Sequence, residues 1–379
     1  MKRLLVPLLF IAAACASSSD RPVEPAAMKV GTYSSDAELS PVGVIPTATL
    51  HDAQRNKDVE VSIDYPTRGG PFPVIVFSHA YGSSNRAYEP LISYWTSNGY
   101  VCIRPKHADA GALRETMREM MPPGREEGRN RRNAAARAAQ QPPQRNPEAE
   151  VWGREHEPQW RDRVADVKLV LDSLDELERR FPELQGKMDH AKIGVAGHSY
   201  GAFTAMLIGG MQTFGNPPLQ LADARVRAVI AMSPQGIAAN RGTTARSWAA
   251  IHIPMLFMTG SNDRGATEAE DANWRKEAFE NSAPGDKYFV LIEGAGHLTF
   301  TGMGGFATFE QQRPMTSPYG MQQPQRGISF MPGRRAFDII KITSLAFWDA
   351  YLKGDTSARD LLQPAKYDES FSGATMMEK

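Results

Sequence analysis

The chain has 379 residues, of which 41% are hydrophobic and 23% are charged. This is enough apolar material for a sizeable core, and α/β chains of this length often fold as one domain. The 43 basic and 43 acidic side chains give a formal net charge of zero, which argues against a partner recruited by charge, such as nucleic acid or an acidic surface.

The first residues have the pattern of an export signal. Two basic residues precede an apolar stretch, Leu4–Ala14, that is too short to span a bilayer. Residues 11–15 resemble the lipobox of bacterial lipoproteins, although Ala12 stands where leucine is usual. We therefore expect a signal segment over residues 1–16, a lipid anchor at Cys15 and a location in the bacterial cell envelope. The alternative is conventional cleavage after a small-x-small site, followed by secretion.

After a Pro-, Ser- and Ala-rich tether over residues 17–44, one domain is expected over 45–365, and a tail over 366–379. Short β-branched runs bounded by turn residues predict strands at Val59–Tyr65, Pro73–Ser78, Tyr100–Arg104, Lys192–Gly197, Val226–Met232, Met255–Thr259 and Lys287–Ile292. Stretches of helical period predict helices at Glu89–Ser97, Trp160–Arg180, Tyr200–Gly209, Glu270–Asn281 and Arg335–Leu352. This alternation, with continuous apolar strands, predicts an α/β fold: a doubly wound, mostly parallel sheet covered by helices on both faces.

Two irregular stretches interrupt the alternation. Residues 108–158 are crowded with Arg, Glu, Ala, Gln and Pro of mixed charge, and we expect a solvated or partly disordered insertion there. Residues 301–334 are rich in Gly, Met, Gln and Pro. Long loops of that kind inside a compact domain are either functional or mobile.

The strongest chemical signal is the pentapeptide from Gly197 to Gly201, a Gly-x-Ser-x-Gly motif between an apolar strand and a helix. This pattern is typical of a nucleophile elbow, in which a sharp turn raises the serine oxygen above the sheet edge and the glycines avoid clashes. The next helix would point its positive N-terminus at the reacting centre. We therefore assign Ser199 as nucleophile, against the alternative of a plain Gly-Ser loop, and expect His198 to pack or to line the substrate site.

A serine hydroxyl needs a base to take its proton. In proteins with this motif, the acid follows the serine in the sequence and the histidine follows the acid. His297 lies after the last predicted strand on a Gly-rich loop, which makes it the candidate base. Asp263 follows the preceding strand and would hold the imidazole in the required tautomer. The rival acids are Glu268 and Asp271, at or inside the next helix, and Glu293, which is close to the histidine in the chain.

A tetrahedral intermediate needs two hydrogen-bond donors for its oxyanion. One is expected to be the backbone N–H of Tyr200, directly after the nucleophile. The other is expected in the loop after the strand Pro73–Ser78, where we assign it to the backbone N–H of Tyr81. The aromatic ring of Tyr81 would also form a wall of the acyl pocket.

These motifs resemble the platelet-activating-factor acetylhydrolase and chlorophyllase branch of the α/β-hydrolase superfamily. The matching segments are Pro73–Arg104, Arg163–Asp172 with the elbow that follows, Gly294–His297 and Phe347–Asp355. Dienelactone hydrolases and bacterial cutinase-like polyester hydrolases are more distant relatives with the same triad order. The resemblance covers most of residues 45–355 and implies the α/β-hydrolase fold.

The resemblance also implies roles for single residues: Ser199 as nucleophile, Asp263 as acid, His297 as base, and Tyr81 and Tyr200 as backbone donors. One departure is the alanine directly before Tyr81, where the family often has glycine, and it would narrow the oxyanion hole.

From these features we expect a carboxylic ester hydrolase, a serine esterase that works through an acyl-enzyme on a small-molecule or lipid ester. No metal or organic cofactor is expected, because the histidines and carboxylates show no metal-ligand spacing. No nucleic-acid partner is expected, and membrane contact would come only through the lipid at Cys15. Two alternatives remain: a serine peptidase or amidase of the same fold, and a non-catalytic, lipid-tethered binding protein on a hydrolase fold.

Overall fold

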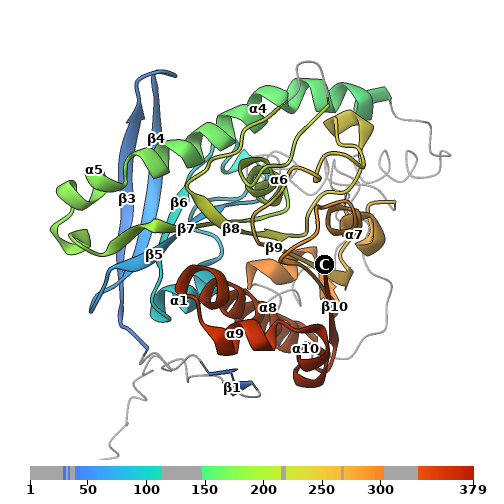
Figure 1. The fold of residues 1–379 in the computed structure, drawn as a ribbon. Helices are drawn as coiled ribbons and strands as arrows, with labels where there is room; N and C mark the ends of the chain where they lie inside the picture. Colours follow the sequence, from blue (N-terminus) through green and yellow to red (C-terminus); the bar gives the residue numbers. More distant parts are fainter. Residues whose placement is uncertain are drawn as a thin grey trace, which may run out of the picture.

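A computed structural model describes residues 29–30, 33–34, 39–112, 147–214, 219–265, 269–302 and 332–379. A nine-stranded sheet runs through the middle of the molecule and carries helices on both faces (Figure 1). The expected lipid-anchor residue Cys15, the rival acid Glu268 and most of the two irregular stretches lie outside the described residues.

The sheet is mostly parallel, as predicted. Its strand order is β11-β10-β9-β8-β7-β5-β6-β4-β3. The strands from β10 to β6 in this order run parallel to their neighbours, whereas β4, β3 and β11 pair antiparallel at the two edges. The bounds are β3 Val42–Asp52, β4 Lys57–Pro66, β5 Phe72–Ser78, β6 Val101–Pro105, β7 Met188–His198, β8 Val226–Met232, β9 Met255–Asn262, β10 Lys287–Gly296 and β11 Ala374–Glu378.

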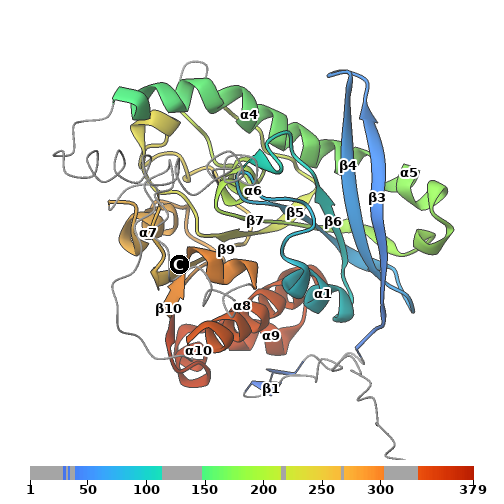
Figure 2. The same cartoon turned by 180° about the vertical axis from the view of Figure 1, so that it is seen from behind.

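The helices bury the two faces of this sheet in two separate cores. On one face lie α4 (Pro147–Asp172), α6 (Tyr200–Ile208) and α7 (Ala272–Glu280), with the short α5 (Leu174–Arg180) at the edge; Figures 1 and 2 show them from opposite sides. On the other face lie α1 (Glu89–Ser97), α8 (Pro332–Trp348), α9 (Thr356–Leu361) and α10 (Pro364–Ser370). Alternate residues of one strand serve the two cores: Val74 and Val76 face the first, and Ile75 and Phe77 the second. A sheet buried on both faces explains why the central strands read as continuous apolar runs.

The structure differs from the sequence prediction mainly at the edges. Residues 366–379, expected as a tail, hold the end of α10 and the strand β11, which pairs with β10. The strand β3 begins at Val42, inside the expected tether, and five of its 11 residues are exposed. An edge strand with one face in solvent carries exposed polar residues, so β3 lacks the apolar run on which the prediction relied. Helix α4 begins at Pro147, inside the stretch assigned to the first insertion.

The expected tether also contributes to the core. Tyr33 is buried, and its hydroxyl donates a 2.6 Å hydrogen bond to Asp349, which also accepts one from Tyr100. This contact docks the two-residue strand β2 (Tyr33–Ser34) beside α9. Among the described residues, no helix combines the length and the apolar character that crossing a membrane requires.

Candidate active site

Ser199 occupies a sharp turn between β7 and α6, at the carboxyl edge of the sheet. Its backbone has φ 56° and ψ −118°, a conformation that L-residues rarely adopt, and its N–H is held by the carbonyl of Met232 at 2.9 Å. The glycines on either side are required by space: a Cβ on Gly197 would overlap the backbone of Gly201, and a Cβ on Gly201 would overlap the carbonyl of Ser78. The motif therefore has the tight geometry of a nucleophile elbow.

Asp263 and His297 are brought together beside this turn. Asp263 follows β9 and is fully buried, and it accepts a 2.8 Å hydrogen bond from Nδ1 of His297. Its other contacts are the hydroxyls of Ser233 and Thr259 and the guanidinium of Arg275, 3.1 Å away. Burial alone would raise the pKa of the Asp263 carboxyl, but the charges of Arg275 and His297 and the hydrogen bonds hold that pKa well below its usual range. An ionised carboxylate at Nδ1 leaves Nε2 of His297 to act as the base.

The rival acids have other positions. Asp271 is the N-cap of α7, where its side chain accepts hydrogen bonds from the backbone N–H groups of Asn273 and Trp274. Glu293 is exposed on β10. Neither carboxylate contacts His297 among the hydrogen bonds of the described residues.

Among the hydrogen bonds of the described residues, none joins Ser199 to His297. The ring of His297 lies against the ring of His198, the residue before the nucleophile, with centroids 4.6 Å apart. Catalytic hydrogen bonds are commonly long without substrate and tighten when it binds. His198 itself is buried, as one of the two alternatives from the sequence predicted, with its ring stacked on Phe300 and its Nδ1 hydrogen-bonded to the hydroxyl of Tyr88.

The two predicted oxyanion donors belong to adjoining segments. The loop after β5 lies against the start of α6, and the rings of Tyr81 and Tyr200 meet edge to face with centroids 5.7 Å apart. The N–H groups on either side of Tyr81 are held: that of Ala80 by the hydroxyl of Tyr88 at 3.2 Å, and that of Gly82 by Asp109 at 2.9 Å. The assignment of the Tyr81 and Tyr200 N–H groups as donors remains a prediction.

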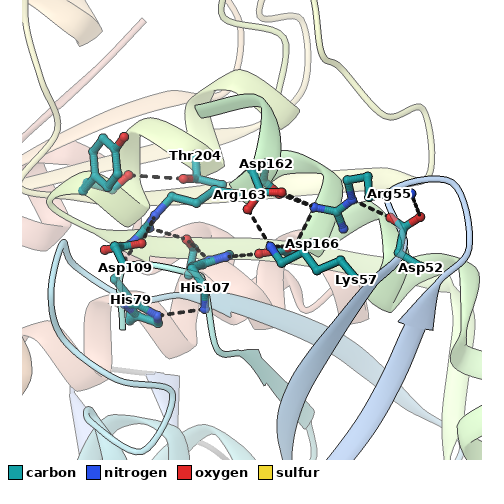
Figure 3. Close-up of polar contacts among 12 residues, drawn as sticks. Asp52, Arg55, Lys57, His79, His107, Asp109, Asp162, Arg163, Asp166 and Thr204 are labelled. Atoms are coloured by element: carbon teal, nitrogen blue, oxygen red, sulfur yellow. Dashed lines mark hydrogen bonds and ion pairs between the residues drawn. The ribbon is translucent and has the colours of Figure 1, made fainter. Parts of the chain in front are cut away.

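A buried polar cluster behind this loop was not predicted from the sequence (Figure 3). Arg163 of α4 reaches both carboxylate oxygens of Asp109, and His107 bridges Ser78 to Asp166 through its two ring nitrogens, at 2.9 Å each. Burial lowers the pKa of His107 well below its ordinary value, so its ring is neutral at physiological pH. A neutral ring that donates from Nδ1 to Asp166 accepts from the Ser78 hydroxyl at Nε2.

One signal for this cluster was present in the sequence. His107 and Asp109 follow the strand Val101–Pro105 at its carboxyl end, which is where parallel α/β sheets place functional side chains. Asp109 was instead assigned to the irregular stretch 108–158. The structure thus shows that this stretch starts later than the sequence suggested.

A cavity of about 200 Å³ lies beside the candidate oxyanion loop, with Tyr81, Asp109, Gln159 and Arg163 in its lining. The hydroxyl of Tyr200 donates to Gln159 at 3.4 Å. Ser199, Tyr200 and His297 are not in the lining of this cavity.

A candidate metal-ligand set lies elsewhere. Asp175, Glu178 and His190 have ligand atoms within 4.8 Å of one another. The two carboxylates belong to α5 and His190 lies at the start of β7, whereas Ser199 follows the end of that strand. The 11-residue strand separates the two places by about 30 Å. Each ring nitrogen of His190 lies within 3.5 Å of one of these carboxylates, so contacts inside the cluster account for its arrangement.

Comparison with known proteins identifies the family. Among solved structures, the chain is similar to a ferulic acid esterase from Streptomyces cinnamoneus, with a TM-score of 0.56 and 19% sequence identity over 90% of this chain and 98% of that chain. At this identity the likeness shows the fold, that of the α/β hydrolases. Residues 47–302, more than half of the sequence, match the family model described as platelet-activating factor acetylhydrolase, isoform II. The chain therefore belongs to the platelet-activating factor acetylhydrolase isoform II family of α/β hydrolases.

Proposed function

We propose that this chain is a serine esterase that cleaves carboxylic esters through an acyl-enzyme at Ser199. The observation that carries the proposal is the buried, ionised Asp263 bound to Nδ1 of His297, next to a strained serine at the carboxyl edge of the sheet. The family description names an acetylhydrolase and the structural neighbour is named a ferulic acid esterase, which supports an ester as the substrate class.

In the proposed reaction the hydroxyl of Ser199 attacks the ester carbonyl while Nε2 of His297 takes its proton. The carbonyl oxygen becomes an oxyanion that accepts hydrogen bonds from the N–H groups of Tyr81 and Tyr200. His297 then gives its proton to the leaving alkoxide, and the ester C–O bond breaks. A water molecule, deprotonated by the same histidine, releases the acid and restores Ser199. Asp263 stays ionised throughout and stabilises the transient imidazolium.

The test compares wild type with Ser199→Ala on p-nitrophenyl acetate and on the matching anilide. We expect kcat on the ester to fall about 1,000-fold or more in the variant, because the nucleophile is gone. The control is Ser173→Ala, since the Ser173 side chain caps no helix N–H in the structure. Full ester turnover by Ser199→Ala would refute the mechanism.

The anilide and an active-site probe separate the alternatives. Turnover of the anilide comparable with that of the ester would favour an amidase or peptidase. A fluorophosphonate that fails to label wild-type Ser199 would favour a non-catalytic binding protein. Labelling of wild type and of Ser173→Ala, without labelling of Ser199→Ala, is the result we expect.

A further inference from the structure

Arg163 links helix α4 to the candidate oxyanion loop. Its Nε and Nη2 donate to the two oxygens of Asp109 at 3.0 and 2.8 Å, and its Nη1 donates to the carbonyl of His79 at 2.8 Å. Both side chains of the pair are almost completely buried. Figure 3 shows Arg163 passing from α4 toward Asp109 and the loop. A guanidinium can hold a carboxylate with one edge and a carbonyl with the remaining donor because its five N–H groups have a fixed planar arrangement.

Asp109 holds the same loop from the other side. One of its oxygens accepts the backbone N–H of Gly82 at 2.9 Å. The carbonyl of His79 and the N–H of Gly82 belong to the peptide units directly before and after the one that carries the Tyr81 N–H. The Arg163–Asp109 pair therefore fixes both flanks of that central peptide.

Arg163 also contacts the segment that carries the second candidate oxyanion donor, the start of α6. The guanidinium of Arg163 lies over the ring of Tyr200, 4.4 Å from its centroid. Tyr200 is the first residue of α6, and its backbone N–H is the other assigned donor. One side chain thus touches both segments whose N–H groups must point at a single oxygen.

The pair is charged under ordinary conditions. Burial alone would raise the pKa of the Asp109 carboxyl, but the charge and hydrogen bonds of Arg163 and the N–H of Gly82 lower that pKa to about 2. A buried ionised pair holds its hydrogen-bonded partners with little freedom, because any displacement exposes an uncompensated charge.

We infer that Arg163 and Asp109 are positioning residues that set the Tyr81 N–H at the oxyanion, by clamping the peptides on both sides of it. This inference rests on the proposed function. Oxyanion donors act at about 2.7–3.1 Å from the developing charge, so a small shift of the loop weakens the transition state more than the bound substrate.

The test uses two variants of the full chain, Asp109→Asn and Arg163→Lys. An asparagine in place of Asp109 keeps an acceptor for Gly82 but loses the charge, and a lysine in place of Arg163 cannot reach the carboxylate and the His79 carbonyl in the same way. We expect kcat on p-nitrophenyl acetate to fall about 10- to 100-fold with KM within twofold of wild type, because removal of an oxyanion donor costs about 100- to 1,000-fold and here the donor is displaced but not removed. Inhibition by a trifluoromethyl ketone, which forms a tetrahedral adduct with Ser199, should weaken by the same factor.

The matched control is the other buried pair, Asp64 with Arg104, which makes no hydrogen bond to the loop 79–83 among the described residues. Asp64→Asn and Arg104→Lys should lower the melting temperature and leave kcat and ketone inhibition within twofold of wild type. A merely structural role of Arg163 and Asp109 would give the same pattern in both pairs.

The inference fails if folded Asp109→Asn and Arg163→Lys keep wild-type kcat, or if KM rises while ketone inhibition is unchanged. Its failure differs from that of the proposed function: an active Ser199→Ala refutes the mechanism, whereas an inactive Ser199→Ala with fully active pair variants refutes the clamp alone. If circular dichroism shows that one of the two variants is unfolded, the other variant is compared with wild type and with the control pair.

Discussion

Gly201→Ala tests whether the elbow and the oxyanion loop are as close as the structure has them. Gly201 is the second residue of α6, and its backbone is ordinary right-handed helix, so alanine there carries no conformational strain. Its Cβ would lie 2.6 Å from the carbonyl carbon of Ser78 and 2.8 Å from the carbonyl oxygen of His79, and would overlap the Ser78 oxygen. The substitution therefore acts on the separation between α6 and the end of β5 and on little else.

The expected effect follows from these distances. Ordinary Cβ contacts begin at 3.4 Å, so the contact at 2.6 Å alone requires helix and loop to part by 0.8 Å, and the overlap with the Ser78 oxygen requires more. All three contacting atoms belong to the backbone, so they cannot rotate away. A displacement of about 1 Å in catalytic geometry costs about 100-fold in rate, and overpacking a tight contact costs about 1–3 kcal/mol of stability. We expect kcat/KM to fall about 100-fold and the urea midpoint of unfolding to fall with it.

The assay is hydrolysis of p-nitrophenyl acetate, together with urea unfolding followed by circular dichroism. Gly209→Ala, at the other end of the same helix, is the control, because its Cβ would meet a methyl group of Val229 at 3.0 Å rather than the loop. It should keep activity within about twofold of wild type, since the far end of α6 touches no candidate catalytic group. A Gly201→Ala variant with wild-type kcat/KM and an unchanged midpoint would refute this reading of the elbow.

Two further predictions concern buried charge. Asp263→Asn should lower kcat about 10⁴-fold and also cost about 3–5 kcal/mol of stability, because Arg275 would be left buried without its counter-charge; turnover within tenfold of wild type would contradict it. His107 and His198 have pKa values held by burial well below 6.5, so below pH 6.5 the unfolded chain binds protons that the folded chain does not. Stability is therefore fully present above pH 6.5 and falls by on the order of 1 kcal/mol per histidine over the first unit below it. The urea midpoint should drop from pH 7.5 to 5.5, and a constant or rising midpoint would count against buried neutral rings.

The fold could be predicted from the sequence where the signal is local. The central strands are apolar on both faces and bounded by turn residues, and the structure confirms them, as it confirms the parallel sheet. The edge strands β3 and β11 were missed because an edge strand with one solvent face has no such run. The expected export signal and the lipid at Cys15 concern residues that the structure does not describe, and they stay predictions.

The candidate site, like the fold, could be predicted from the sequence only where the signal is local. The elbow is a contiguous pentapeptide, and the order serine, acid, histidine along the chain led to Asp263 and His297, which the structure places in contact. The pair of Arg163 and Asp109 could not be found by such rules, because the two residues are 54 positions apart and meet only through the packing of α4 against the sheet edge. No spacing pattern marks a contact that depends on the tertiary fold.

Two buried arginines in this molecule serve the candidate site by the same physical means. Arg275 pairs with Asp263 and donates to the carbonyl oxygens of Ser233 and Pro234, just as Arg163 pairs with Asp109 and donates to a loop carbonyl. A buried ion pair adds little net stability, because the desolvation of both charges offsets their attraction. A guanidinium that binds a carboxylate still has N–H donors left, and backbone carbonyls at the ends of strands supply the missing acceptors. Each charge pair therefore holds the backbone of a neighbouring loop in place. We explain the two pairs by the positions that they impose on Asp263 and on the candidate oxyanion loop, and not by the stability that they add.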